Sequence, residues 1–450
     1  MKSLHMLLRF AIVGGLILLL LIPLMMIRGV ISEREAYRDE AYLRVAQSRA
    51  GAQTLTGPIR VVPWRESRQV ETVDAAGVKK TETQVEDSYW LQMPSSLVVE
   101  GSMQPDERRI GLFRVPVYSW KAKVRAAFSQ DDYPVREGRV YGQPYLVVGI
   151  ADVRGLVGSP KLAVDGEALS LQPGLGDVTG MGKGLHVPVR GFSDNAGGVL
   201  AASTVELDLV LDGTRSLAVV PVGDDSRIAV QSSWPHPSFG GSFLPNQRTV
   251  DTQGFNAQWS VSSLASQAQR QLRGSGDNEP ETVSVELVNP VDIYTQADRA
   301  SKYGILFILL TFVGFILFEL IKDLRIHPLQ YLMVGLALAI FFLLLLSLSE
   351  HIPFWVAYAV SATACIGLQA VYLTGVLRSR LRGLGFAAML TVLYGALYGL
   401  LVSENNALLM GSLLLFGVLA AAMWITRRID WYALGAGVKP AHDAGDSGAA

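Results

Sequence analysis

Long apolar stretches occur near both ends of the chain, and a mixed segment rich in turn residues lies between them. Residues 10–27 and 303–425 are apolar blocks with short polar breaks, whereas residues 33–302 alternate apolar and polar positions between clusters of Gly, Pro, Asn and Asp. A helix needs roughly 20 apolar residues to cross a hydrocarbon core of about 30 Å. The pattern therefore predicts membrane-spanning helices flanking a separate domain.

Six stretches are long and apolar enough to be transmembrane helices. The first could also be a cleavable signal peptide, because Lys2 and Arg9 precede it, but Pro23 and Arg28 follow where a small-x-small cleavage site would be expected, so we predict an uncleaved anchor. Ser32 and Glu35 then resemble a capping box that starts a juxtamembrane helix over residues 31–52. The predicted spans are residues 10–30, 302–321, 329–349, 352–376, 384–402 and 407–426.

The basic residues of the short connections predict the orientation of these spans, since Lys and Arg are retained on the cytoplasmic side. Residues 349–351 and 403–406 contain no Lys or Arg. We therefore expect residues 1–9 and 427–450 in the cytoplasm, the latter with a disordered end, and residues 31–301 in the periplasm. The basic residues of the other connections are Lys2, Arg9, Lys322, Arg325, Arg378, Arg380, Arg382, Arg427 and Arg428.

The middle domain consists of short alternating segments typical of strands and hairpins. One short helix is expected over residues 261–272, and residues 274–280 form a polar loop. The predicted fold is a polytopic α-helical membrane protein with six transmembrane helices and a large all-β, sandwich-like periplasmic domain, an antiparallel sandwich or a pair of packed sheets. The clearest predicted strands are residues 59–64, 89–93, 96–100, 111–118, 122–128, 145–150, 205–211, 217–222, 227–231 and 282–287.

Composition narrows the function classes. Half of the 450 residues are hydrophobic, 18% are charged and the net charge is −1, so a polybasic surface for nucleic acid is not expected. The single cysteine, Cys365, lies in an apolar run, which leaves the middle domain without a disulfide. That domain must therefore be stabilised by its own core.

The middle domain offers only partial matches to catalytic or metal-binding patterns. A Walker loop ending at Lys183 would need glycine in place of Asp177 and Ser or Thr in place of Gly184. Ser119 and Lys121 share a strand face through periodicity alone. The histidines His186 and His236 have no second ligand at metal-binding spacing. We predict no catalytic residue, cofactor or metal.

The densest run of Pro, Gly and aromatic residues is the segment 233–245, which we name the aromatic loop. Trp234, His236, Phe239 and Phe243 are candidates for a partner-binding surface, because aromatics on an irregular loop can form one. The alternative, which we favour, is that the three aromatic rings turn inward and attach a long crossover to the sheets.

Ionisable and polar groups in the spans are few, and such groups can mark a transport path. Glu319 is the main candidate, although it lies one turn from Lys322 near a helix end, where both can reach the headgroups. Gln369 is near the middle of its span and more readily forms an interhelical hydrogen bond. Glu350 and His351 are expected at the outer interface as a cap or a domain contact.

Several stretches along almost the whole chain carry a resemblance to a known family. They are residues 18–28, 233–245, 254–255, 258–259, 298–306, the run 327–351 and residues 428–432. In these stretches the chain resembles the CreD family of bacterial inner-membrane proteins, also called cell envelope integrity or colicin tolerance proteins. The resemblance implies a role in envelope integrity under stress, including the response to β-lactams, and an association with the Cre two-component regulon. It implies no catalytic mechanism.

Two functions fit these features. The first is a non-enzymatic protein whose periplasmic domain binds an envelope partner, namely a protein, peptidoglycan or a lipid, while the helices contact the bilayer. The alternative is a transporter or lipid-handling protein that uses the C-terminal five-helix bundle, for which hydrophobic cargo would need little buried charge. A membrane-anchored hydrolase is the third. The sequence predicts no oligomeric state.

Overall fold

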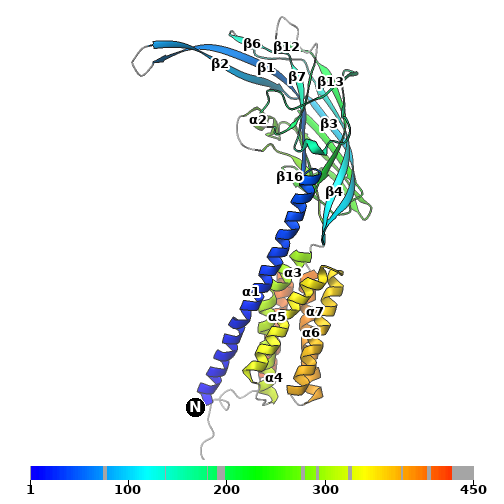
Figure 1. Ribbon diagram of the computed structural model, residues 1–450. Helices are drawn as coiled ribbons and strands as arrows, with labels where there is room; N and C mark the ends of the chain where they lie inside the picture. The colour runs from blue at the N-terminus through cyan, green and yellow to red at the C-terminus, as the bar shows by residue number, and fades with distance from the viewer. Residues whose placement is uncertain are drawn as a thin grey trace, which may run out of the picture. The chain divides into compact units, whose positions relative to one another are not determined.

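A computed structural model describes most of the chain (Figure 1). The chain divides into two compact units, one formed by Met1–Tyr37 with Val291–Ala450 and the other by Arg38–Pro290. We call them the helical unit and the β-rich unit. The described residues are 2–73, 79–136, 138–179, 181–189, 198–274, 279–289, 293–322, 327–376, 379–402 and 407–427.

In its described residues, the helical unit contains most of α1 and six later helices. Four described helices are long and apolar enough to cross a membrane, and a fifth span is reached if α3 and α4, bent by 42° at their junction, count as one. The described apolar part of α8, Leu409–Ala421, is shorter, so the six predicted spans remain a prediction. The helices are α1 (Lys2–Ser48), α3 (Ile293–Lys302), α4 (Gly304–Lys322), α5 (Pro328–Ser349), α6 (Phe354–Val376), α7 (Arg380–Val402) and α8 (Ala407–Thr426).

Helix α1 continues without a break through the predicted juxtamembrane region. Its buried positions Leu20, Leu24, Ile27 and Ile31 recur every three to four residues and form one stripe. The prediction of a capping box at Ser32 is wrong, because no helix begins there. Extending an existing helix adds a hydrogen bond for every residue fixed, whereas starting a new one is costly.

The β-rich unit is built from two large sheets. In sheet A, β1 and β2 continue as a paired ribbon out to Val73 and Lys79 (Figure 1). Sheet A contains β1 (Gln53–Val73), β2 (Lys79–Gln92), β6 (Arg139–Tyr141), β7 (Tyr145–Ile150), β10 (Gln172–Pro173), β11 (Gly184–Pro188), β14 (Ser216–Val220), β16 (Pro237–Gly241) and β19 (Val283–Leu287). Sheet B contains β3 (Ser96–Ile110), β4 (Phe113–Phe128), β8 (Lys161–Val164), β9 (Glu167–Leu169), β13 (Ser203–Thr214), β15 (Asp225–Ser232), β17 (Gln247–Asp251) and β18 (Gly254–Ser262).

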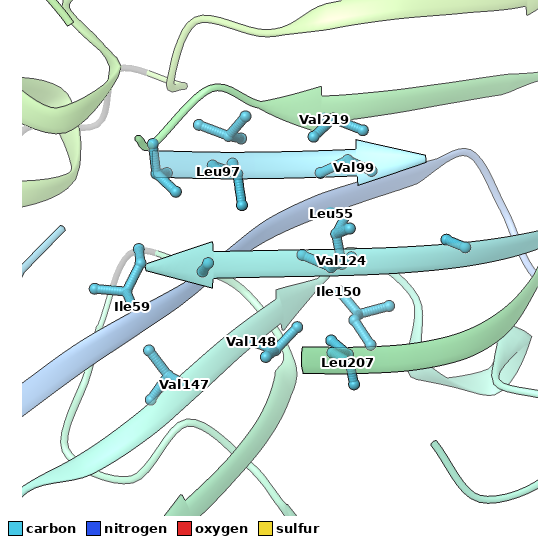
Figure 2. Packing of buried hydrophobic residues seen from close by; sticks show 14 of the residues in the cluster. Leu55, Ile59, Leu97, Val99, Val124, Val147, Val148, Ile150, Leu207 and Val219 are labelled. Carbon is cyan, nitrogen blue, oxygen red and sulfur yellow. The ribbon is translucent and has the colours of Figure 1, made fainter. Parts of the chain in front are cut away.

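The two sheets share one hydrophobic core. Leu55 and Val147 of sheet A and Val99, Val124 and Leu207 of sheet B belong to the same cluster of buried side chains (Figure 2). Strands such as β13 and β18 contribute alternate residues, as the period of two requires, whereas all six residues of β7 are buried. The predicted pair of packed sheets is therefore present as two sheets around a shared core.

Two details of the prediction for this unit are wrong. The sheets are mixed rather than antiparallel, because β1 pairs in parallel with β14 and β15 pairs in parallel with β3. The helix expected over residues 261–272 is shorter, since β18 extends to Ser262 and α2 covers only Ala268–Arg273. In β18, Trp259 and Val261 alternate into the core, so the strand pattern continues past the predicted start of the helix.

Within the β-rich unit, polar contacts connect the end of α1 to the loops and strands that follow. The guanidinium of Arg49 donates to Asp212 at 2.6 Å. The carboxylate of Asp152 accepts from the backbone of Gly51 at 3.1 Å and from the guanidinium of Arg154. That guanidinium also donates to the Gln47 carbonyl at 2.8 Å, one of the carbonyls that a helix end leaves unpaired.

Acidification should weaken this junction. Hydrogen bonding from Arg154 lowers the pKa of Asp152 from 3.8 to about 2. A carboxylate whose pKa is lower in the folded state stabilises the fold above its unfolded pKa, and this contribution is lost as the pH falls through about 2. We expect Asp152→Ala to reduce the free energy of unfolding by about 1–3 kcal/mol at neutral pH.

The measurement is denaturant unfolding of the purified chain, followed by near-ultraviolet circular dichroism. The difference in the free energy of unfolding between wild type and Asp152→Ala should shrink as the pH approaches about 2. Asp106→Ala is the control, because Asp106 is exposed and its ion pair with Arg108 is 3.5 Å long. If Asp152→Ala lowered the free energy of unfolding equally at every pH, the ionised Asp152 carboxylate would not be the group that stabilises this junction.

Candidate functional site

An open hollow lies on the outer face of sheet B. The side chains at alternate positions of β3, β4, β13 and β15 that do not enter the core point to this face. The hollow is open and has a volume of about 690 Å³. We call it the sheet B hollow. It is lined by Glu100, Gly101, Ser102, Lys121, Ala122, Lys123, Val157, Ser159, Lys161, Asp208, Leu209, Val210, Ala229, Val230, Gln231, Asn256 and Gln258.

Strand register places alternating charges in one row across the hollow. Glu100 lies opposite Lys123, Lys123 opposite Asp208, and Asp208 opposite Lys161. Directly opposite residues on one sheet face have Cβ atoms roughly 4.5–5.5 Å apart, so each cation has an anion as its neighbour. At its other end the row continues through Ala229 to Gln258.

A second row supplies neutral hydrogen-bonding groups and one lysine. Asn256 lies opposite Gln231, Gln231 opposite Ser102, and Ser102 opposite Lys121. On its other side Lys121 faces Val210. The two rows together present ammonium, amide, hydroxyl and carboxylate groups, and the lining contains no aromatic ring. Such a surface suits a polar ligand that both donates and accepts hydrogen bonds.

The aromatic loop crosses from one sheet to the other. It leaves β15 of sheet B, forms β16 at the edge of sheet A, and returns to β17 of sheet B. Trp234 is half-buried and donates to the Val288 carbonyl at 3.1 Å. Phe239 packs edge-on against Trp259, with ring centroids 5.9 Å apart, and the Phe243 carbonyl accepts from the Trp259 indole at 3.1 Å.

Of the four candidate residues in this loop, only His236 is exposed. The rings of Trp234, Phe239 and Phe243 pack against the shared core. This geometry agrees with the interpretation of an attached crossover and leaves little of the three rings for a partner.

The residues of the partial catalytic matches do not come together as a reactive set. Nδ1 of His186 lies 3.0 Å from the Gly174 carbonyl. Lys121 lines the sheet B hollow, in which Ser119 has no part. The described residues contain no group of three or more His, Cys, Asp or Glu side chains that could hold a metal ion.

In the helical unit, the polar candidates have different surroundings. Glu319 belongs to α4, but its side chain lies outside the described part of the structure. Gln369 is 2% exposed, and neither atom of its amide has a hydrogen-bond partner within the described residues. The expected interhelical hydrogen bond of Gln369 is therefore not present there.

Glu350 joins three segments of the helical unit. Its carboxylate lies 3.6 Å from the Arg34 guanidinium of α1 and accepts from the Tyr294 hydroxyl of α3 at 3.2 Å. Its side chain is only 8% exposed. The sequence pattern placed Glu350 at an interface as a contact but did not identify these partners.

Two solved protein structures resemble the chain only weakly. Two crystal structures of an M1 zinc metallopeptidase from Deinococcus radiodurans, one of them a mutant with a bound substrate, match at 9% identity with TM-scores of 0.20 and 0.19. The first match covers 47% of this chain and 53% of the metallopeptidase, and the second covers 43% and 42%. Scores this low carry no argument about fold or function.

Comparison of sequences assigns the chain to a family. Residues 5–432 match the family described as "Inner membrane protein CreD". The Escherichia coli (strain K12) protein of that name is 38% identical over 426 residues, which cover 93% of this chain and 92% of the relative. The match includes both apolar blocks and the whole β-rich unit, and the chain therefore belongs to the CreD family of inner membrane proteins.

Proposed function

We propose that this protein supports the integrity of the cell envelope under stress by presenting its β-rich unit in the periplasm, where the sheet B hollow binds an envelope partner. The basic residues in alternate short connections support this orientation with both termini in the cytoplasm. Membership of the inner-membrane family supports the location in that membrane.

The observation that carries the proposal is the polar lining of a hollow of about 690 Å³ on an exposed sheet face. A lipid chain would gain little there, because its burial would cover the charges of Lys121, Lys123 and Asp208 without pairing them. A peptide segment or the glycan and peptide groups of peptidoglycan can hydrogen-bond to the same groups. Among the envelope partners considered, the hollow therefore favours protein or peptidoglycan over lipid.

Photocrosslinking in living cells tests the site. We expect a photoreactive residue in place of Gln231 to form adducts with a periplasmic component, and these adducts to be lost when Lys121→Glu and Lys123→Glu reverse two of the charges in the hollow. A photoreactive residue in place of the exposed Gln84 on β2 is the matched control. Adducts from a probe at His236 but none from Gln231 would move the binding surface to the aromatic loop, and adducts with cytoplasmic proteins would overturn the orientation.

A second candidate function, transport through the helical unit, is favoured only by the buried amide of Gln369. Under the leading proposal, Gln369→Leu should leave cellular resistance to detergent and β-lactam unchanged. The variant should also stabilise the helical unit by about 1–3 kcal/mol, because it removes buried polar atoms without partners. Growth assays and thermal unfolding of the purified chain measure the two effects. Loss of resistance in a stably folded Gln369→Leu protein would favour transport instead.

A further inference from the structure

The turn between β3 and β4 combines exposed apolar and basic side chains. Ile110 pairs with Phe113 as the last rung of the ladder, and Gly111 and Leu112 form the two-residue turn. Gly111 has a φ of 59°, which suits glycine at the first turn position. The Leu112 side chain at the tip is 49% exposed. The tip therefore presents an apolar side chain to its surroundings.

Beside this tip, two positive charges face each other across the strand pair. Arg109 lies directly opposite Arg114 in the register, and like charges in that position are destabilising. Arg114 has a carboxylate oxygen of Glu107 at 3.9 Å, and Arg109 makes no ion pair with any described residue. Arg108 adds a third exposed cation. An external anion between Arg109 and Arg114 would relieve their repulsion.

The tip also lies beside the point where the chain enters the β-rich unit. Ile110 and Phe113 pack with Val115 and Val117 against Ala41 and Val45 of α1. The unit begins at Arg38, and residues 28–37 separate it from Ile27, which ends the N-terminal apolar block. Even a fully extended chain of that length spans only about 40 Å, so the start of the unit lies within that distance of the apolar block.

We propose that the β3–β4 turn docks on the surface of the bilayer, with Leu112 in the interfacial layer and Arg109 and Arg114 on the phosphates of anionic lipids. Basic groups attract anionic headgroups, and each arginine near the surface raises the affinity about fivefold. An apolar side chain beside them adds burial in the interface. The inference does not depend on the proposed partner of the sheet B hollow.

Site-directed spin labelling of the full chain in vesicles tests the proposal. The label is placed at Leu112→Cys in a Cys365→Ser background, and its collisions with a water-soluble nickel chelate are measured. Leu264→Cys is the control, because Leu264 is 97% exposed elsewhere in the same unit. In vesicles containing phosphatidylglycerol, the label at Leu112 should collide with the chelate several-fold less often than the label at Leu264.

Charge removal separates docking from a merely local role. Arg109→Gln with Arg114→Gln should return the chelate collisions at Leu112 to the level of Leu264 in phosphatidylglycerol vesicles. In vesicles of phosphatidylcholine alone, the two labels should already be similar. Equal collisions at both positions in phosphatidylglycerol vesicles would overturn the proposal. Protection at Leu112 that persists in both the glutamine variant and phosphatidylcholine would also overturn it, because the shielding would then come from the protein.

Discussion

Replacement of Arg60 by alanine should lower the free energy of unfolding of the β-rich unit by about 3–5 kcal/mol. Arg60 is completely buried, and its guanidinium donates to Gln92 Oε1 at 2.8 Å, to the Ala201 carbonyl at 3.0 Å and to Ser203 Oγ at 2.5 Å. The guanidinium carbon also lies 4.7 Å from the centroid of the Phe128 ring. Alanine would leave a cavity together with buried acceptors that lack a donor.

Arg60 stays positively charged although it is buried. Desolvation lowers the pKa of its guanidinium to about 10, against the opposite effect of the Asp165 and Asp131 carboxylates. The guanidinium is therefore a cation at neutral pH. Arg60→Lys should retain little of the stability that Arg60 provides, because an ammonium cannot reproduce the planar arrangement of donors in a guanidinium.

Hydrogen exchange of the amides of β1, β4 and β13 measures the effect in the full chain. Arg65→Ala is the matched control on the same strand, since Arg65 is exposed and pairs with Asp87 at 2.6 Å on the surface. The Arg65→Ala variant should lose no more than about 1 kcal/mol of the free energy of unfolding. Equal protection in Arg60→Ala and Arg65→Ala would show that the buried contacts of Arg60 contribute nothing net.

Alternation along the chain is a local property, and it predicted much of the β-rich unit. The strand expected over residues 145–150 coincides with β7. The strands expected over residues 111–118 and 122–128 are one strand, β4, because Trp120 continues the inward alternation between them. Pairing is not local, so the parallel neighbours β1 with β14 and β15 with β3 could not be derived from either segment alone.

Hydropathy predicted the positions of the apolar helices for an equally direct reason, since length and composition are what the bilayer requires. The structure also gives a physical account of one stretch that carried the family resemblance. His327 caps α5 by accepting from the Leu329 amide, and Gln330 accepts from the His327 amide in return. With Pro328 in the first turn, this stretch is a helix start rather than a chemical site.

The sheet B hollow could not be found in the sequence. Lys121 and Lys123, like Glu206 and Asp208, alternate with buried residues in the way that any solvated sheet face does. Only the register across four strands brings the charges of β3, β4, β8 and β13 into one row. The aromatic loop differs, because its unusual composition serves the packing of Phe239 against Trp259, in line with the inward-facing alternative favoured from the sequence.

Gly101→Ala should destabilise the β-rich unit by about 3 kcal/mol, because the indole of Trp120 occupies the space that a side chain would need. A Cβ at Gly101 would lie 2.0 Å from Trp120 Nε1 and 2.6 Å from Cε2. Trp120 is fully buried across the β3–β4 pair, so the ring cannot move aside without displacing the core between the sheets. Gly51→Ala is the control, since its Cβ would lie 4.0 Å from its nearest neighbour.

A double-mutant cycle tests whether this clash with Trp120 is the cause of the destabilisation. Trp120→Leu alone should cost about 3 kcal/mol through the cavity that it leaves. The variant with both changes should be more stable than the sum of the two losses predicts, by about 1–3 kcal/mol, because leucine leaves room for the new methyl group. Hydrogen exchange of the amides of β3 and β4 measures all four proteins. Strict additivity would contradict the clash, because Trp120 and Gly101 would then act independently in the core.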